Sequence, residues 1–233
     1  MAAFLLVPGA WLGGWCWRDV APRLEAGGHT VIAATLTGLG ERAHLLRPDI
    51  GLDTHVADIV GLLHHRDLND VTLVGHSYGG TVITAVAERV PDRIRRLVYL
   101  DAAVPRDGES NNDAIGLERA AALRSQADAD GDGWRVPPPV SVGEGLPDKL
   151  RCWVTARLTP HPLRPFGEPV SARSRAAAAL PRTFIRTSTQ SVLYSELMER
   201  ARKAGWSCRD LEGGHYPMFT QPQRLAAALA ELA

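Results

Sequence analysis

Residues 71–79 read VTLVGHSYG, and the interpretation of this chain starts from them. The apolar run 71–74 predicts a buried strand, and the residues after the run have the spacing of a helix. Gly75, Ser77 and Gly79 fit the pattern G-x-S-x-G, in which the glycines permit a sharp turn and the serine projects from it. The position between strand and helix favours a nucleophilic serine over a plain glycine-rich turn with a capping serine.

Strands and helices alternate on both sides of this motif. Short apolar runs predict strands, and segments with apolar residues three and four apart predict helices. The strands are expected at 3–7, 29–36, 71–74, 94–100, 183–187 and 207–211, and the helices at 15–26, 53–65, 79–90, 192–203 and 223–232. Because the strands are continuously apolar, they predict an α/β fold with a mostly parallel sheet that is covered by helices on both faces.

The alternation stops after Asp101 and returns near residue 183. The segment between them is rich in Pro, Gly, Ala and charged residues and has no parallel-strand pattern. So long an interruption is not expected to be one loop of a compact domain, so we interpret it as an inserted helical cap. The expected organisation is an α/β core of 1–104 and 181–233 with a helical cap of 105–180.

The composition limits the possible partners. The 233 residues contain 26 Lys+Arg and 26 Asp+Glu, so the net charge of zero gives no electrostatic reason to expect nucleic acid or an anionic membrane. No apolar run reaches the roughly 18 residues of a membrane span, and the N-terminal run lacks the basic residues of a signal peptide. The three cysteines are far apart and form no CxxC pair, so we expect a reducing cytoplasm and no zinc site.

A serine hydroxyl needs a base to become a nucleophile. His215 is the candidate, because it follows the last expected strand in a glycine-rich loop and because serine, acid and histidine follow in this order in such folds. Asp101 is the predicted acid, since it ends the strand next to the serine strand, at the edge where open α/β sheets form their sites. The alternative for His215 is an ordinary loop histidine. The alternative for Asp101 is a strand-end residue that caps the next loop.

The oxyanion of a reacting carbonyl needs two backbone N–H donors. One is expected at Tyr78, directly after the serine, and the other in the loop near Gly9 and Ala10 that follows the first strand.

Four stretches resemble the bacterial branch of the plant methylesterase and hydroxynitrile lyase group of α/β-hydrolases. They are 7–45 (VPGAWLGGWCWRDVAPRLEAGGHTVIAATLTGLGERAHL), 73–80 (LVGHSYGG), 94–105 (IRRLVYLDAAVP) and 213–219 (GGHYPMF). The resemblance covers almost the whole chain and is weakest in the cap. It implies a core sheet without the first two strands of larger hydrolases, a helical cap over the site, no metal and no organic cofactor. It also implies Ser77 as nucleophile, His215 as base, and the N–H groups of Ala10 and Tyr78 as oxyanion hole.

The chain departs from that family at two places. The family's usual His-Gly after the first strand is Pro8-Gly9 here, and the plant enzymes' acid position holds Ser188-Thr189-Gln190, without a carboxylate. The lyases carry a lysine after the catalytic histidine and a threonine in place of the loop glycine. This chain has Tyr216 and Gly9 at those positions, which favours an esterase.

The expected function is hydrolysis of a small carboxylic ester through an acyl-enzyme. Thioester cleavage, acyl transfer, or a lyase or cyclase step in natural-product biosynthesis would use the same residues, and a ligand-binding protein without activity is the third alternative. The sequence leaves the substrate open, and a homodimer is compatible with it. The residues expected to line the substrate pocket are Trp11, Trp134, Trp153, His161, Phe166 and Tyr216. For the four that lie in the cap, Trp134, Trp153, His161 and Phe166, packing inside the cap is the alternative.

Overall fold

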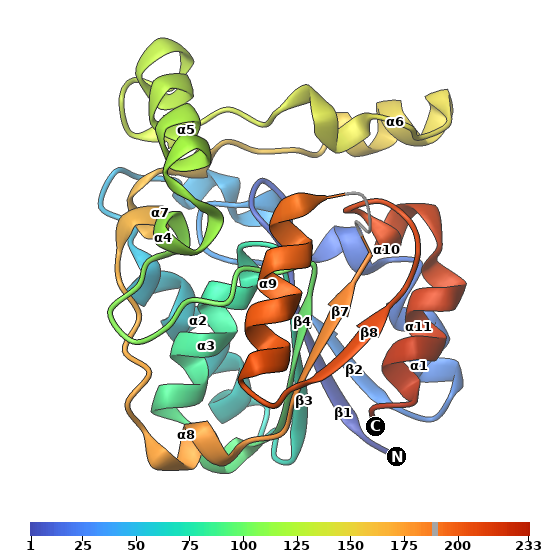
Figure 1. Ribbon diagram of the computed structural model, residues 1–233. Helices are drawn as coiled ribbons and strands as arrows, with labels where there is room; N and C mark the ends of the chain where they lie inside the picture. The colour runs from blue at the N-terminus through green and yellow to red at the C-terminus, as the bar shows by residue number, and fades with distance from the viewer. Residues whose placement is uncertain (188–190) are drawn as a thin grey trace.

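The computed structural model describes residues 1–187 and 191–233 and shows one twisted sheet between two layers of helices (Figure 1). The strand order is β2-β1-β3-β4-β7-β8, and all five neighbouring pairs are parallel. The α/β fold with a mostly parallel sheet is therefore confirmed. The strands are β1 (Ala3–Val7), β2 (Thr30–Ala33), β3 (Val71–His76), β4 (Ile94–Leu100), β7 (Arg182–Arg186) and β8 (Ser207–Asp210).

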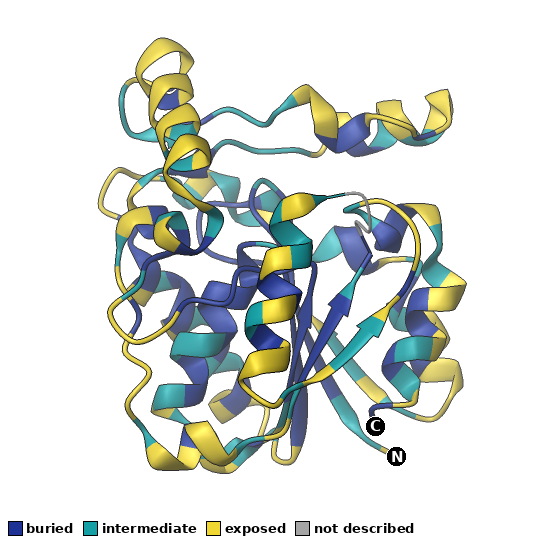
Figure 2. Cartoon of the chain, in the orientation of Figure 1, coloured by how far each residue is buried: buried dark blue, intermediate teal, exposed yellow. Residues whose placement is uncertain are grey.

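The central strands are apolar throughout because both of their faces are covered. Every residue of β3 is buried, whereas the edge strands β2 and β8 contain only exposed and half-buried residues. Figure 2 shows this gradient from the centre of the sheet to its edges. Consequently the turn that follows β3 is anchored in the best-packed part of the molecule.

Successive residues of a strand point into two different cores. On β1, Leu5 and Val7 belong to one apolar cluster, and Phe4 and Leu6 belong to the other. The first cluster is covered by α2 (Leu52–His65), α3 (Gly79–Arg89) and α9 (Val192–Lys203). The second is covered by α1 (Ala21–Ala26), α10 (Pro217–Thr220) and α11 (Pro222–Ala230).

The segment expected to form a helix over 15–26 is divided in two. A 3-10 turn, η1 (Gly14–Trp17), comes first, and α1 begins only at Ala21. Pro22 explains the break, because proline fits the first turn of a helix and not its interior. The strand expected at 29–36 is also shorter, since β2 ends at Ala33. Two further 3-10 turns of the core are η2 (Gly40–Leu45) and η3 (Pro91–Arg93).

Most of the segment 105–180 lies over the carboxyl ends of the strands (Figure 1). It holds α4 (Asn111–Ile115), α5 (Leu117–Asp130), η4 (Val140–Gly143), α6 (Asp148–Thr155) and α7 (Arg164–Gly167). It also contains an antiparallel pair that the sequence did not indicate, β5 (Arg135–Val136) with β6 (His161–Pro162). The last helix, α8 (Arg175–Ala179), packs at the opposite end of the sheet, against α3 and η3.

The division into a core of 1–104 and 181–233 and a cap of 105–180 stays a prediction. Within residues 1–187 and 191–233, no helix combines the length and the apolar character that a membrane crossing needs.

Candidate active site

Ser77 occupies the turn between β3 and α3 with a left-handed backbone, at a φ of 54°. This conformation is unfavourable for a residue with a side chain and costs of order 1–3 kcal/mol, so it is found where the surroundings enforce it. They do so here: a Cβ on Gly75 would lie 2.5 Å from the carbonyl oxygen of Gly79, and one on Gly79 would lie 2.8 Å from that of Pro8. The two glycines of the motif are thus required by close backbone contacts.

Asp101 follows β4 directly, is completely buried, and also has a left-handed backbone, with a φ of 41°. Its Oδ2 accepts a hydrogen bond from Nδ1 of His215 at 3.2 Å, and its Oδ1 accepts one from the backbone N–H of Thr187 at 2.6 Å. The hydroxyl of Thr187 donates to the carbonyl of Gly214 at 2.9 Å. Thr187 therefore joins the loop that carries Asp101 to the loop that carries His215.

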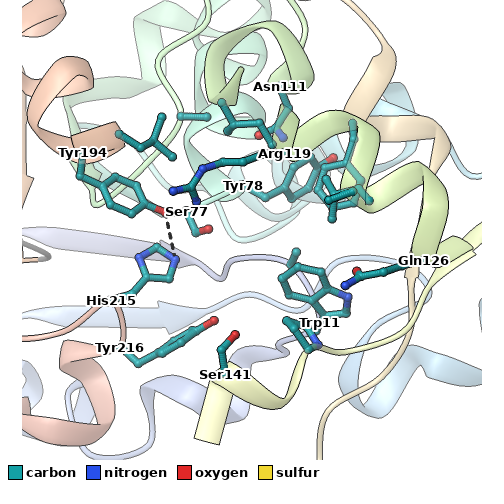
Figure 3. Close-up of a pocket in the computed structure, with 18 residues that line it drawn as sticks. Trp11, Ser77, Tyr78, Asn111, Arg119, Gln126, Ser141, Tyr194, His215 and Tyr216 are labelled. Atoms are coloured by element: carbon teal, nitrogen blue, oxygen red, sulfur yellow. Dashed lines mark hydrogen bonds between the residues drawn. The ribbon is translucent and has the colours of Figure 1, made fainter. Parts of the chain in front are cut away.

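Tyr194, in the first turn of α9, lies against the other side of the His215 ring. The two rings are stacked at a centroid distance of 4.9 Å and an angle of 20°, and the tyrosine hydroxyl lies 3.2 Å from Nε2 of His215 (Figure 3). Burial raises the pKa of Tyr194, and the neighbouring Ser77 side chain acts in the opposite direction. The hydroxyl is therefore close to both Ser77 and His215. Sequence reasoning placed this residue in a helix and did not select it.

His76, inside the motif, supports the site from behind. Its buried ring lies 4.7 Å from that of His215, and its Nε2 donates to the carbonyl oxygen of His215 at 2.8 Å. Burial, with a smaller contribution from His215, lowers the pKa of His76 to about 3. A neutral His76 thus fixes the backbone of the histidine loop and does not compete as a base.

A cavity of about 310 Å³ opens above Ser77 (Figure 3). Both residues expected to supply oxyanion donors, Ala10 and Tyr78, line it beside Ser77 and His215. Trp11, which follows Ala10, has a left-handed backbone with a φ of 65°, and its indole N–H donates to the carbonyl of Val136 at 3.0 Å. The complete lining is Ala10, Trp11, Ser77, Tyr78, Ala103, Asn111, Ile115, Arg119, Ala122, Leu123, Gln126, Pro139, Ser141, Phe166, Leu193, Tyr194, His215 and Tyr216.

The six residues expected in the substrate pocket separate into two groups. Trp11, Phe166 and Tyr216 line the cavity, whereas the expectation for Trp134, Trp153 and His161 does not agree with the structure.

These three side chains have other neighbours. Trp134 lines a separate depression, and Trp153 packs on Trp15 at 5.4 Å beneath the guanidinium of Arg18. His161 is buried between Tyr78 and Phe166, with ring distances of 4.7 and 4.4 Å.

A chain of buried polar rings lies next to the cavity. Nε2 of His55 donates to the carbonyl oxygen of Thr37 at 3.1 Å, so its Nδ1 accepts from the hydroxyl of Tyr78 at 2.9 Å. Burial lowers the pKa of His55 to about 4 and holds that of His161 well below its usual value. Both imidazoles are therefore neutral near pH 7, because folding buries them.

Ser188, Thr189 and Gln190, at the plant enzymes' acid position, lie outside the described residues. In the remainder of the chain, no three His, Cys, Asp or Glu side chains are grouped so that they could hold a metal ion.

Comparison with known proteins gives consistent results. The model of the alpha/beta hydrolase family matches residues 4–228. A carbendazim hydrolyzing esterase from Nocardioides sp. (strain SG-4G) is 38% identical over 249 residues, which cover 100% of both chains. Putative methylesterase 14, chloroplastic, of Arabidopsis thaliana is 27% identical over 99% of this chain and 71% of its own. An extracellular alpha/beta-hydrolase from a Paenibacillus species has the same fold, with a TM-score of 0.87 at 23% identity over 99% of this chain and 98% of its own.

The buried His55 should make the protein less stable in acid. Its pKa is lowered from 6.5 to about 4 in the folded state, so between these values the unfolded chain binds the proton better and stability falls as the pH falls. From this shift we expect His55 alone to remove about 2 kcal/mol of unfolding free energy between about pH 7 and about pH 5.

Urea unfolding at both pH values measures this, with His55→Gln compared to His64→Gln, an exposed histidine of the same helix. His64→Gln should keep the wild-type acid loss, and His55→Gln should reduce it. Equal losses in the two variants would contradict the assignment.

Proposed function

The chain belongs to the alpha/beta hydrolase family, and from this premise we propose that it hydrolyses small carboxylic esters through an acyl-enzyme on Ser77. The proposal rests on one observation. Ser77 projects from a strained turn into a cavity shared with His215, and Nδ1 of His215 donates to the buried carboxylate of Asp101. The names of the relatives, an esterase and a methylesterase, support an ester as substrate.

In the proposed reaction, Ser77 Oγ attacks the ester carbonyl carbon while its proton passes to Nε2 of His215. The tetrahedral intermediate collapses, and the alcohol leaves with that proton. Water, deprotonated by His215, then cleaves the acyl-enzyme and releases the acid. Asp101 keeps the Nδ1–H tautomer of His215 and stabilises the imidazolium that forms twice in the cycle. The N–H groups of Ala10 and Tyr78 are the proposed oxyanion donors.

Tyr194 adds a step to this scheme. Its hydroxyl, not Ser77 Oγ, is the partner of His215 Nε2 among the described residues, at 3.2 Å. Because burial raises its pKa, the phenol keeps its proton at neutral pH and can accept one hydrogen bond while it donates another. We propose that it relays the proton: Ser77 gives its proton to the Tyr194 oxygen as Tyr194 gives its own to Nε2, and the tyrosine is unchanged at the end.

Replacing Ser77 by alanine tests the nucleophile. The variant should keep its thermal midpoint within a few degrees and lose activity by about 10⁶-fold, as removal of a nucleophilic serine does elsewhere. A fluorophosphonate probe should label the wild-type protein at Ser77 and leave the variant unlabelled.

The substrate panel should contain carbendazim, methyl esters and 4-nitrophenyl esters, with the released acid and alcohol identified. Retention of more than about one per cent of the rate by Ser77→Ala would show that another residue is the nucleophile.

Replacing Asp101 by asparagine tests the acid. The amide can occupy the same place but stabilises the wrong imidazole tautomer, so kcat should fall by about 10³- to 10⁴-fold with little change in fold. Gln190→Ala, at the plant enzymes' acid position, is the matched variant and should cost less than about tenfold. The kcat of both variants is measured on one ester substrate, and circular dichroism checks their folds. A larger loss of kcat in Gln190→Ala than in Asp101→Asn would overturn the assignment of Asp101.

Replacing Tyr194 by phenylalanine tests the relay. Loss of the hydroxyl should lower kcat by about 10- to 100-fold, since Ser77 must then pass its proton directly to Nε2 of His215 without the relay. A proton inventory in mixed H₂O and D₂O should curve for the wild type, with two protons in flight, and become linear in the variant. Tyr216→Phe, on the same cavity, is the control and should keep the curvature. An unchanged or faster Tyr194→Phe would mean that substrate displaces this hydroxyl.

A further inference from the structure

The residues that line the cavity above Ser77 carry a net positive charge. Of the eighteen residues that line it, Arg119 is the one with a permanent charge, and none of these eighteen is Asp or Glu. Neutral hydrogen-bonding groups of Asn111, Gln126 and Ser141 lie around the same cavity. The lining therefore offers a substrate one positive charge that no lining carboxylate neutralises.

Arg119 stands in the first turn of α5, at the rim of the cavity. Figure 3 shows its side chain directed toward Ser77 and Tyr194, and its charge acts to lower the pKa of the Tyr194 hydroxyl. It also lines the adjoining depression that continues past His215 and Tyr216, where Glu144 supplies a carboxylate. The guanidinium is thus close enough to the reacting groups to influence them.

Arg119 differs from the other arginines near it. Arg124, on the same helix, pairs with Asp128 at 2.9 Å, and Arg135 pairs with Asp132 at 2.6 Å. For Arg119, the described part of the chain provides no ion pair within 4.0 Å. A guanidinium presents N–H groups in a fork that matches the two oxygens of a carboxylate, so an arginine in this position is suited to an anionic group of the substrate.

We propose that Arg119 forms a subsite for a carboxylate, and that the chain prefers esters with a second, ionised carboxylate to neutral esters of the same size. Half-esters of short dicarboxylic acids are the chemical class that fits. The carboxylate would meet the guanidinium while the ester carbonyl lies at Ser77, so the inference rests on the proposed esterase activity. In this proposal Arg119 selects the substrate and takes no part in bond cleavage.

The test compares matched pairs of substrates: 4-nitrophenyl hydrogen glutarate with 4-nitrophenyl pentanoate, and 4-nitrophenyl hydrogen succinate with 4-nitrophenyl butyrate. In at least one pair the wild type should have the higher kcat/KM for the anionic ester. Arg119→Gln should lower that value by about 10- to 100-fold, the range expected for hydrogen bonds to a charged group, and leave the neutral ester within about threefold. Arg124→Gln is the matched control on the same helix and should change neither. The preference should weaken in about 0.5 M NaCl, because salt screens exposed charges.

Each other result overturns the subsite. Equal loss with both esters would mean that Arg119 acts on the reacting oxyanion, and no loss would mean that it is a solvated surface charge. If no ester is hydrolysed, the esterase proposal fails separately, and binding still decides the subsite. The Ser77→Ala protein should bind the anionic ester about tenfold or more tightly than its neutral partner by calorimetry, and adding Arg119→Gln should remove the difference.

Discussion

The left-handed backbone of Ser77 is the constraint on which the rest of the site depends. A residue with a side chain adopts this conformation only when its surroundings enforce it, and here the surroundings are β3, wholly buried, and α3, which begins two residues later. Gly75 and Gly79 allow the backbone on both sides to approach more closely than any Cβ would permit. The serine is thereby held at the carboxyl edge of the sheet, and every other functional group is placed relative to it.

The groups around the serine are supported by contacts between loops. Asp101 is fixed by Thr187, which also binds the histidine loop through Gly214, and His76 holds the His215 backbone from behind. Buried imidazoles with lowered pKa values act here as neutral hydrogen-bonding groups. The polar interior around the cavity is therefore organised to keep one histidine, His215, partly exposed and oriented, while the others stay inert.

The sequence predicted the fold and the serine turn because these depend on local patterns: apolar strands, glycines at fixed positions, and alternation with helices. The family was predicted from the resemblance of four stretches of the chain. It also predicted that Asp101 and His215 meet, since strand ends of a parallel sheet share one edge. The catalytic roles of these residues remain proposals, as does the division into core and cap.

Prediction of the pocket residues from the sequence failed where the direction of a side chain depends on tertiary packing. Trp153 and His161 pack against other aromatic rings, and Trp134 lines a separate depression. Tyr194 lies in a helix whose apolar pattern is that of any amphipathic helix, so the pattern did not single it out. The one signal for Tyr194 was its place in the first turn after β7, at the same sheet edge as Ser77.

The lining of the cavity has a divided origin. Nine of its eighteen residues come from the segment 105–180. Ser77 comes from the turn after β3, His215 from the loop after β8, and Tyr194 from the first turn of α9. In α5, which supplies four of those nine, only Ala127 is buried. Substitutions along α5 therefore disturb little of the core, so an evolving lineage could exchange one substrate for another there while inheriting its chemistry and its folding stability unchanged.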